Sequence, residues 1–338
     1  MVTKGMTPSK YFNSDAEASM SSDGHFGRTV FFHRDFRGFT GGHLKVWDYF
    51  NHVNSSAHHK PRINFSKETL WDETNPWLGL REQSQEAFKA GPGDILFLAG
   101  MDWLSLTANQ RQKSTTPIIN LVQGIKHSDP ADIRSSFLKY KAVRICVSQP
   151  IREAIESSHK VNGPLYVIPN GIDRTLIPSP SNLLDRPVDV LLAALKQPHL
   201  GRHLAAMLQR PGRTVKLLNS KLPRTDFLHC LSQAKLTIFL PKQQEGFYLP
   251  ALEGMAAGTL VVCPDCVGNR SFCVTGQNSF VPRYTITGIL DAAETVLQLS
   301  STMTQQILIN ATHTAAVHDL LKERQTFLKL LDNIELLW

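Results

Sequence analysis

The chain of 338 residues lacks any run of about 18 apolar residues, the length that a transmembrane helix needs. Its N-terminus lacks the apolar segment that a secretory signal carries. It has five cysteines, and its one C-x-x-C, Cys263 to Cys266, has no second pair at zinc-site spacing. These absences argue against a membrane-spanning, secreted or zinc-binding protein, and we expect a protein of the reducing cytoplasm.

Positive charge exceeds negative charge, giving a net charge of +7. An excess of this sign favours a polyanionic partner, such as a nucleotide diphosphate, an anionic membrane surface or nucleic acid. A soluble protein with an ordinary basic surface is the alternative. Nucleic acid is the least expected partner, because no recognition motif or basic-aromatic platform is present.

Buried-type apolar runs alternate with helical patterns along most of the chain. Such runs occupy 29–32, 94–98, 118–122, 144–148 and 165–168, and then 188–195, 215–218, 235–240 and 259–263. This alternation predicts an α/β fold with parallel sheets, and the length predicts two domains. A segment with three prolines, residues 174–187, is typical of a connection between them.

The predicted boundaries follow from these patterns. Residues 1–27, rich in Ser, Gly and Asp, are expected to be a flexible leader. The first domain is predicted for residues 28–168 and the second for 169–320. Residues 321–338 are expected to form a C-terminal helix that crosses back to the first domain.

The most informative stretch is Glu245-Gly-Phe-Tyr-Leu-Pro-Ala-Leu-Glu253. An apolar run ending at Leu240 precedes it, and small residues up to Gly258 and a second apolar run follow it. The expected order is strand, loop, short helix, strand. Glu245 and Glu253 then lie at the carboxyl end of a parallel sheet, where open α/β sheets bind ligands. Two acids at this spacing also occur by chance, so the surrounding residues carry the interpretation.

This segment resembles the Glu-x7-Glu motif of retaining glycosyltransferases of the GT-B fold, the group called family 4. The stretch 165–173, ending Val-Ile-Pro-Asn-Gly-Ile-Asp, resembles the family's link between domains, and 267–281 resembles its later glycine-rich segments. The resemblance implies two Rossmann-like domains with an interdomain cleft. It also implies transfer of a sugar from a nucleotide-sugar donor, used as substrate and not as cofactor.

The resemblance assigns site residues in the second domain. Glu253 would accept hydrogen bonds from the donor ribose, since a carboxylate suits a vicinal diol. Glu245 would contact the donor sugar, with the backbone N–H groups of Gly246 and Phe247 nearby. Lys196 and Arg202 stand in for two cations that hold the donor diphosphate in relatives, displaced slightly from the usual pattern.

In the first domain, Gly41-Gly42 lies between a predicted strand and a helix, where glycine lets the backbone approach an anion. The pair matches the family's glycine loop over the donor phosphates. Many relatives carry a histidine at the end of the 118–122 strand. Here Gln123 holds that place and His127 follows four residues later, so either residue is a candidate.

No D-x-D tripeptide occurs in the chain. Transferases that neutralise a diphosphate with a metal usually need such carboxylates, so we predict no metal site and charge neutralisation by cations and helix dipoles. The unmatched segment 51–93 holds the acceptor candidates Lys60, Arg62, Lys67, Trp71 and Trp77. Aromatic faces suit sugar rings and cations suit an anionic glycan or lipid headgroup, whereas core packing is the favoured explanation for each tryptophan taken singly.

The resemblance therefore implies a retaining glycosyltransferase with a glycan or lipid-linked acceptor, acting in surface polysaccharide or glycoconjugate synthesis. We expect it in the cytoplasm, with peripheral contact at the inner face of an anionic membrane as an open possibility. The alternative is a related protein with weak turnover that binds a sugar nucleotide or glycan.

Overall fold

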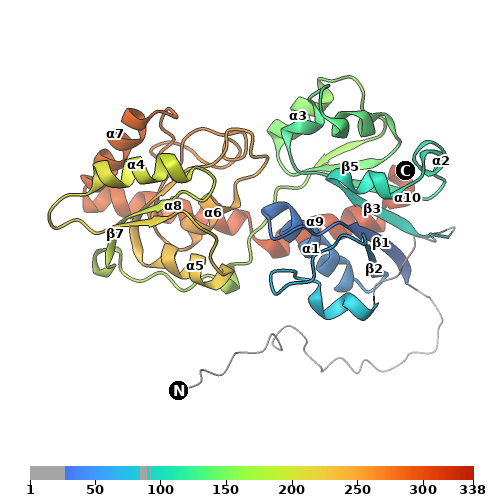
Figure 1. Cartoon of the computed structure of the whole chain (residues 1–338), viewed down its shortest axis with the longest axis horizontal. Coiled ribbons are helices and arrows are strands. Elements are labelled where there is room, and N and C mark those ends of the chain that lie inside the picture. The colour runs from blue at the N-terminus through green and yellow to red at the C-terminus, as the bar shows by residue number, and fades with distance from the viewer. Residues whose placement is uncertain (1–26, 84–89, 92) are drawn as a thin grey trace, which may run out of the picture.

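The structure is a computed structural model that describes residues 27–83, 90–91 and 93–338. The leader predicted for 1–27 lies outside the described residues, apart from Gly27. Figure 1 shows two lobes side by side, with the earlier residues in one and most of the later residues in the other. Within the described ranges, no helix is both long enough and apolar enough to cross a bilayer.

The first lobe is built on a parallel sheet with the strand order β2-β1-β3-β4-β5-β6. Its strands are β1 (Arg28–Arg34), β2 (His59–Phe65), β3 (Ile95–Ala99), β4 (Ile118–Val122), β5 (Val143–Cys146) and β6 (Leu165–Val167). Its helices are α1 (Gly41–Asn54), α2 (Ala108–Lys113) and α3 (Gln149–Glu156). All its strand pairs are parallel, as the sequence predicts.

Alternate residues of these strands point to opposite faces of the sheet. Phe32 and Phe97 share a buried cluster with α1, whereas Phe31 and Leu98 share another with Trp103. The second cluster is covered by two 3-10 helices, Gly100–Ser105 and Ile133–Lys139, which supply Trp103 and Phe137. The sheet is therefore enclosed on both sides.

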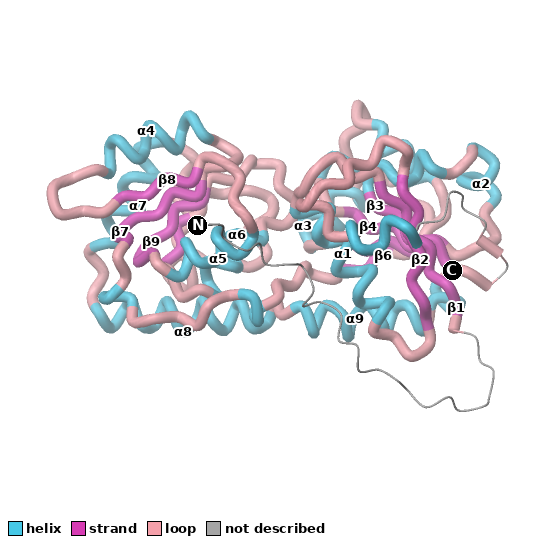
Figure 2. The backbone as a smooth tube through the Cα atoms, turned by 60° about the horizontal axis from the view of Figure 1, so that its bottom comes forward, coloured by secondary structure: helices cyan, strands magenta, loops and turns pink. Residues whose placement is uncertain are grey.

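The second lobe is built on a parallel sheet with the strand order β10-β9-β7-β8. Its strands are β7 (Val188–Ala193), β8 (Val215–Leu218), β9 (Ala234–Phe239) and β10 (Leu260–Val262). Its helices are α4 (Pro198–Leu208), α5 (Arg224–Ser232), α6 (Leu249–Ala256), α7 (Ile286–Leu297) and α8 (Ser301–Val317). Figure 2 shows the strands of the two lobes as separate groups, each surrounded by helices.

The chain passes between the lobes twice, and the two passages lie against each other. Ile172 N–H donates to the carbonyl of His318 at 2.9 Å, and Leu320 N–H donates to the carbonyl of Ile172 at 3.0 Å. A Cβ added at Gly171 would lie 2.7 Å from Leu320 N, so glycine permits this approach. Two helices follow, α9 (Leu320–Asp332) and α10 (Ile334–Leu337). The ring of Phe327 in α9 packs edge-on against Tyr49 of α1.

One strand of the first lobe was not predicted. Residues 59–65, treated as an irregular polar stretch, form β2 at the edge of the sheet beside β1. Only His59 and Ile63 of this strand are buried, and Lys60 and Arg62 are exposed. Proline is compatible with an edge strand, where Pro61 needs no second ladder partner. The strand therefore lacks the continuous apolar run that marks its neighbours.

Candidate functional site

The predicted strand, loop, helix and strand around the two glutamates are confirmed as β9, α6 and β10. The loop 240–248 between β9 and α6 is held by backbone hydrogen bonds to the segment that follows β10. Tyr248 N–H donates to the carbonyl of Gly268 at 3.0 Å, and Val267 N–H donates to that of Gln243 at 3.1 Å. A Cβ at Gly268 would lie 2.8 Å from Tyr248 N, so glycine is needed here. The loop is thus fixed at the carboxyl edge of the sheet.

Glu245 lies in this loop and pairs with Lys196. The Lys196 ammonium donates to Glu245 Oε1 at 2.7 Å. Lys196 belongs to the turn between β7 and α4, so adjacent strands supply the two charges. The Lys196 side chain is 44% exposed and that of Glu245 is 19% exposed. An ion pair this exposed contributes about 1 kcal/mol or less, so an incoming anion can replace the carboxylate at low cost.

Glu253 lies on α6 and is fully buried. Its Oε1 accepts a hydrogen bond from the guanidinium of Arg224, the first residue of α5. Burial alone would lower the pKa of the Arg224 guanidinium, but the charge of Glu253 beside it raises that pKa above the usual value. The sequence analysis did not predict a role for Arg224, because a single arginine 29 residues before Glu253 belongs to no recognisable motif.

The two lobes touch at Gly246. A Cβ there would lie 2.0 Å from the carbonyl oxygen of Gln123, so the loop can meet the end of β4 only with glycine at this position. The Ser148 hydroxyl donates to the carbonyl of Gly246 at 3.1 Å. The Gln123 amide donates to the carbonyl of Gly42 at 3.3 Å. Gly42, Gln123 and Gly246 are therefore brought together from α1, β4 and the second lobe.

Two backbone donors remain available in this region. Across residues 27–83, 90–91 and 93–338, no hydrogen-bond acceptor is found for the N–H groups of Gly246 and Phe247. The Phe247 side chain turns inward and packs against Phe272 and His318, with ring centroids 5.3 and 5.6 Å apart. Unpaired N–H groups next to a helix N-terminus are suited to hold an anion.

The predicted glycine pair begins α1. Thr40 is the N-cap, and its side chain accepts a hydrogen bond from His43 N–H at 3.3 Å. Gly41 is exposed, and a Cβ there would meet nothing within 4 Å. Space at Gly41 and its position at a helix N-terminus are compatible with the predicted contact to donor phosphates, which stays a prediction.

His127 follows Gln123 in the short 3-10 helix Ile125–His127. Its side chain is buried, and its Nδ1–H donates to the carbonyl of Gly124 at 3.1 Å. Burial lowers the pKa of His127 to about 4, and the charges acting on it come from Arg134, Asp132 and Arg144 of its own lobe. In this conformation Gln123, and not His127, reaches toward Gly42. The assignment of His127 to the site stays a prediction, with Gln123 as the alternative that the sequence left open.

Arg202 lies on α4, six residues after Lys196. Its guanidinium donates to His199 Nδ1 at 2.8 Å, and its side chain is exposed. Among the described residues it makes no ion pair with either glutamate. Lys196 is thus joined to Glu245 directly, whereas the predicted phosphate contact of Arg202 remains untested.

The acceptor candidates of segment 51–93 divide into two groups. Lys60, Arg62 and Lys67 are exposed. Trp77 is fully buried and meets Trp47 edge-on, so of the two alternatives for this residue core packing is the one that the structure shows. Trp71 is partly buried, with Arg81 5.6 Å above its ring.

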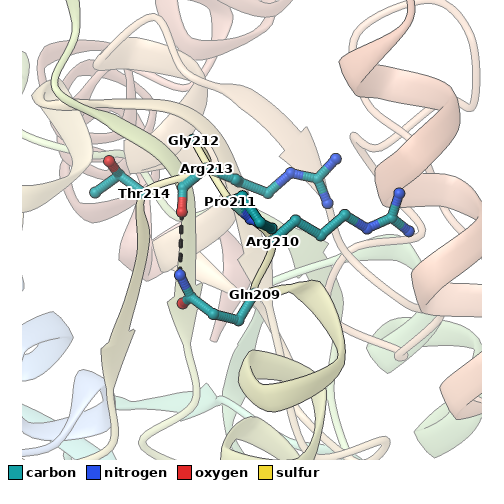
Figure 3. Close-up of a pocket in the computed structure, with 6 residues that line it drawn as sticks. All are labelled: Gln209, Arg210, Pro211, Gly212, Arg213 and Thr214. Carbon is teal, nitrogen blue, oxygen red and sulfur yellow. Dashed lines mark hydrogen bonds between the residues drawn. The ribbon is translucent and has the colours of Figure 1, made fainter.

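Two hollows lie on the second lobe. One of about 290 Å³ is lined by Gln197, Lys242, Gln243, Gln244 and Tyr284, beside Lys196 and Glu245 in the chain. A second of about 490 Å³ is lined by residues 209–214, between the end of α4 and the start of β8 (Figure 3). The second lies at the amino end of β8, opposite the edge that carries the glutamates. Within the described parts of the chain, no group of three or more His, Cys, Asp or Glu side chains could hold a metal ion.

Comparison with solved structures bears on the fold. Sucrose-phosphate synthase from Thermosynechococcus elongatus superposes with a TM-score of 0.70 at 14% identity, covering 91% of this chain and 99% of that one. Anabaena Alr3699/HepE in complex with UDP-glucose gives 0.69 at 15% identity, covering 90% and 99%. A glycosyltransferase from Rickettsia africae gives 0.63 at 13% identity, covering 91% and 99%. No protein-family model matches the chain, and no curated protein matches it.

The chain has the GT-B fold. In this GT-B protein the carboxyl end of β9 and the carboxyl end of β4 meet at Gly246 and Gln123. Glu245, Lys196, Gly42 and Gln123 are thus gathered where the two Rossmann-like domains meet, and Glu253 is linked to this junction through Arg224. Open parallel sheets bind their ligands at this edge.

Proposed function

We propose that this protein is a nucleotide-sugar-dependent glycosyltransferase. The observation that carries the proposal is the placement of Glu245 and Glu253 on a loop and a helix at the carboxyl edge of β9, with Lys196 against Glu245. Solved structures of similar fold include complexes with UDP-glucose and with UDP. UDP-sugars are therefore the first donors to test.

Each group has a distinct role in this proposal. Glu253 accepts hydrogen bonds from the ribose hydroxyls, and Glu245 contacts the donor sugar. Lys196 leaves Glu245 for the diphosphate, to which the N–H groups of Gly246 and Phe247 also donate. A fixed set of donors around a leaving diphosphate stabilises the charge that develops on it.

The finer parts of the proposal rest on the resemblance of the Glu-x7-Glu segment. They are retention of anomeric configuration, independence of divalent metal, and a glycan or lipid-linked acceptor in surface polysaccharide or glycoconjugate synthesis. Action in the cytoplasm, with the protein bound peripherally to the inner face of the membrane, belongs to the same proposal.

Thermal unfolding with a panel of sugar nucleotides tests donor binding, because a ligand of the native state raises the melting temperature by mass action. Nucleotide release from the stabilising donor then tests turnover, with and without EDTA. Glu253→Ala should raise the donor KM about ten- to a hundredfold, as expected when a hydrogen bond to a charged group is lost. No stabilisation by any sugar nucleotide would overturn the proposal, and strict dependence on Mg²⁺ or Mn²⁺ would overturn the metal-independent part.

A binding protein with weak turnover is the second candidate. Gln123 stands where many relatives carry histidine, and Arg202 pairs with His199 in place of any acid of the site. Stabilisation by a sugar nucleotide, with no nucleotide released in the presence of candidate acceptors, would favour this candidate.

A further inference from the structure

The hollow of about 290 Å³ on the second lobe has a polar lining. Its residues come from the turn after β7, the loop after β9 and the segment before α7, and they are Gln197, Lys242, Gln243, Gln244 and Tyr284. In the part of the chain that the structure describes, no aliphatic side chain lines it. Three amides, one ammonium and one phenol hydroxyl suit a ligand rich in hydroxyl groups better than an apolar ligand.

The walls of this hollow are fixed by hydrogen bonds within the protein. The Tyr284 hydroxyl donates to the carbonyl of Pro241, and it also forms a hydrogen bond with the Gln197 side chain. The N–H group of Glu245 donates to the carbonyl of Lys242 at 3.1 Å, which closes the tip of the loop. A ligand therefore meets walls that are already ordered, so little conformational entropy is lost when it binds.

The side chains at the rim of the hollow have no protein partner. Lys242, Gln243 and Gln244 are exposed, and within the described ranges none of their side chains makes a hydrogen bond or an ion pair. The lining residues include no Asp or Glu, so the Lys242 ammonium gives the hollow an excess of positive charge. This charge attracts an anionic group.

The hollow lies next to Glu245 and Lys196. Gln197 follows Lys196 in the chain, and Gln244 precedes Glu245. Burial raises the pKa of the Tyr284 hydroxyl, and the charge of Glu245 raises it further, so this hydroxyl lies near that carboxylate. Ligand sites usually measure about 300–1,000 Å³, so a hollow at the small end of this range has room for one sugar unit and not for a nucleotide.

We propose that this hollow binds a monosaccharide unit that carries an acidic group, either a carboxylate or a phosphate. The Lys242 ammonium pairs with the acidic group, and the side-chain amides of the three glutamines exchange hydrogen bonds with the sugar hydroxyls. The inference rests on the proposed function and adds a substrate class to it. The acidic unit belongs either to the donor sugar or to the acceptor, and the two arms of the experiment distinguish these sources.

The donor arm uses isothermal titration. It first identifies which of UDP, ADP and GDP the wild type binds most tightly, and then compares the Kd values of the glucose and glucuronate derivatives of that nucleotide. The acceptor arm uses saturation-transfer NMR with the nucleoside diphosphate in excess. It compares glucose with glucuronate and glucose 6-phosphate, and inorganic phosphate serves as an anion without a sugar.

Both arms are run on the wild type, Lys242→Gln and Gln244→Glu. Lys221→Gln is the matched control, because Lys221 is an exposed lysine on the loop after β8, at the same edge of the sheet but outside the lining of the hollow. We expect the wild type to prefer the acidic ligand about three- to tenfold in one arm, the range for an exposed ion pair supported by hydrogen bonds.

Lys242→Gln should bring this preference to about one, because the ammonium is lost. Gln244→Glu should bring it below one, because a carboxylate in the lining repels the acidic group. Lys221→Gln should leave the preference unchanged. Equal losses in the two lysine variants would show a general effect of net charge and would overturn the inference.

The remaining outcomes separate this inference from the proposed function. A preference in the donor arm assigns the acidic unit to the donor sugar, and a preference in the acceptor arm alone assigns it to the acceptor. Wild-type ratios near one in both arms, with the nucleotide still bound, overturn the inference and leave the proposed function intact, and so does a preference that Lys242→Gln keeps. Inorganic phosphate that binds as tightly as glucose 6-phosphate also overturns it, because the hollow then holds an anion and no sugar. Failure of UDP, ADP and GDP alike to bind the wild type overturns the proposed function itself, and this inference with it.

Discussion

Replacing Glu323 by glutamine is expected to destabilise the junction between the lobes strongly. Glu323 lies on α9 and is buried. It accepts hydrogen bonds from the Lys45 ammonium at 2.6 Å, from His52 Nε2 at 3.3 Å and from Gly171 N–H. Lys45 is buried as well, and also donates to the carbonyl of Gly171 at 3.2 Å. One carboxylate thus joins the first helix, the last part of the chain and the linker.

The expected loss of stability follows from the buried charge of Lys45, which remains after the Glu323 carboxylate is removed. Glutamine keeps the volume but removes the charge, so among the described residues Lys45 retains Asp48, 2.8 Å away, as its one ionic partner. Breaking a buried pair by removing one partner costs about 3–5 kcal/mol. At about 2–4 °C per kcal/mol for a unit of this size, the melting temperature should fall by roughly 6–20 °C.

The measurement is the free energy of unfolding in urea, with thermal unfolding alongside it. Glu156→Gln is the control, since Glu156 forms an exposed pair with Arg152 and the loss of this pair should cost less than about 1 kcal/mol. The double variant Lys45→Met/Glu323→Leu should recover most of the loss, because an apolar replacement removes both buried charges. A loss below about 1 kcal/mol for Glu323→Gln would refute the reasoning.

Three further predictions concern the rest of the molecule. Burial lowers the pKa of His127 from 6.5 to about 4, so the neutral form is favoured in the folded state. The free energy of unfolding should thus fall by up to about 3 kcal/mol between pH 6.5 and pH 4, and a pH series on His127→Gln that keeps the full slope would contradict this. Gly246→Ala should weaken donor binding and stability because its Cβ meets the Gln123 carbonyl, whereas Gly79→Ala, with nothing within 4 Å, should change neither in titration and melting experiments. Lys60→Ala/Arg62→Ala should weaken sedimentation with anionic phospholipid vesicles at low salt but not donor affinity, and unchanged sedimentation would show that these cations form only a solvated face.

The sequence predicts best the parts of the fold whose stability depends on local, fully buried segments. The strand expected at 118–122 coincides with β4, because every residue of it is buried between two covered faces and the apolar run is continuous. The edge strand β2 could not be predicted in this way. One side of it faces no neighbouring strand, so charged residues and a proline interrupt its pattern.

The candidate site divides in the same way. Glu245 and Glu253 could be placed from the sequence, because a strand, a turn and a helix fix their separation along the chain. Their pairing with other residues could not: Lys196 was expected at the donor diphosphate and not against Glu245, and Arg224 was not expected at the site at all. Lys196 and Arg224 come from turns and helices 49 and 29 residues away, and the contact between Gly246 and Gln123 joins different lobes. These contacts depend on the order of the strands in each sheet and on how the two lobes meet. The local pattern of apolar and polar residues contains neither kind of information.

The buried ion pair of Lys45 and Glu323 shows most clearly what could not be predicted from the sequence. A lysine in a helix with an apolar stripe is expected to face water, since charged side chains are almost never fully buried unless paired. Lys45 is buried because Glu323, 278 residues later, is brought back to α1 by the second passage between the lobes. The carboxylate in turn accepts from Gly171, where the first passage occurs. Each of the three residues looks ordinary in its own segment, and only their meeting at the two passages makes the buried ion pair stable. Predicting this network from the sequence would have required knowing that the chain passes between the lobes twice at the same place. The network in turn holds these two passages together.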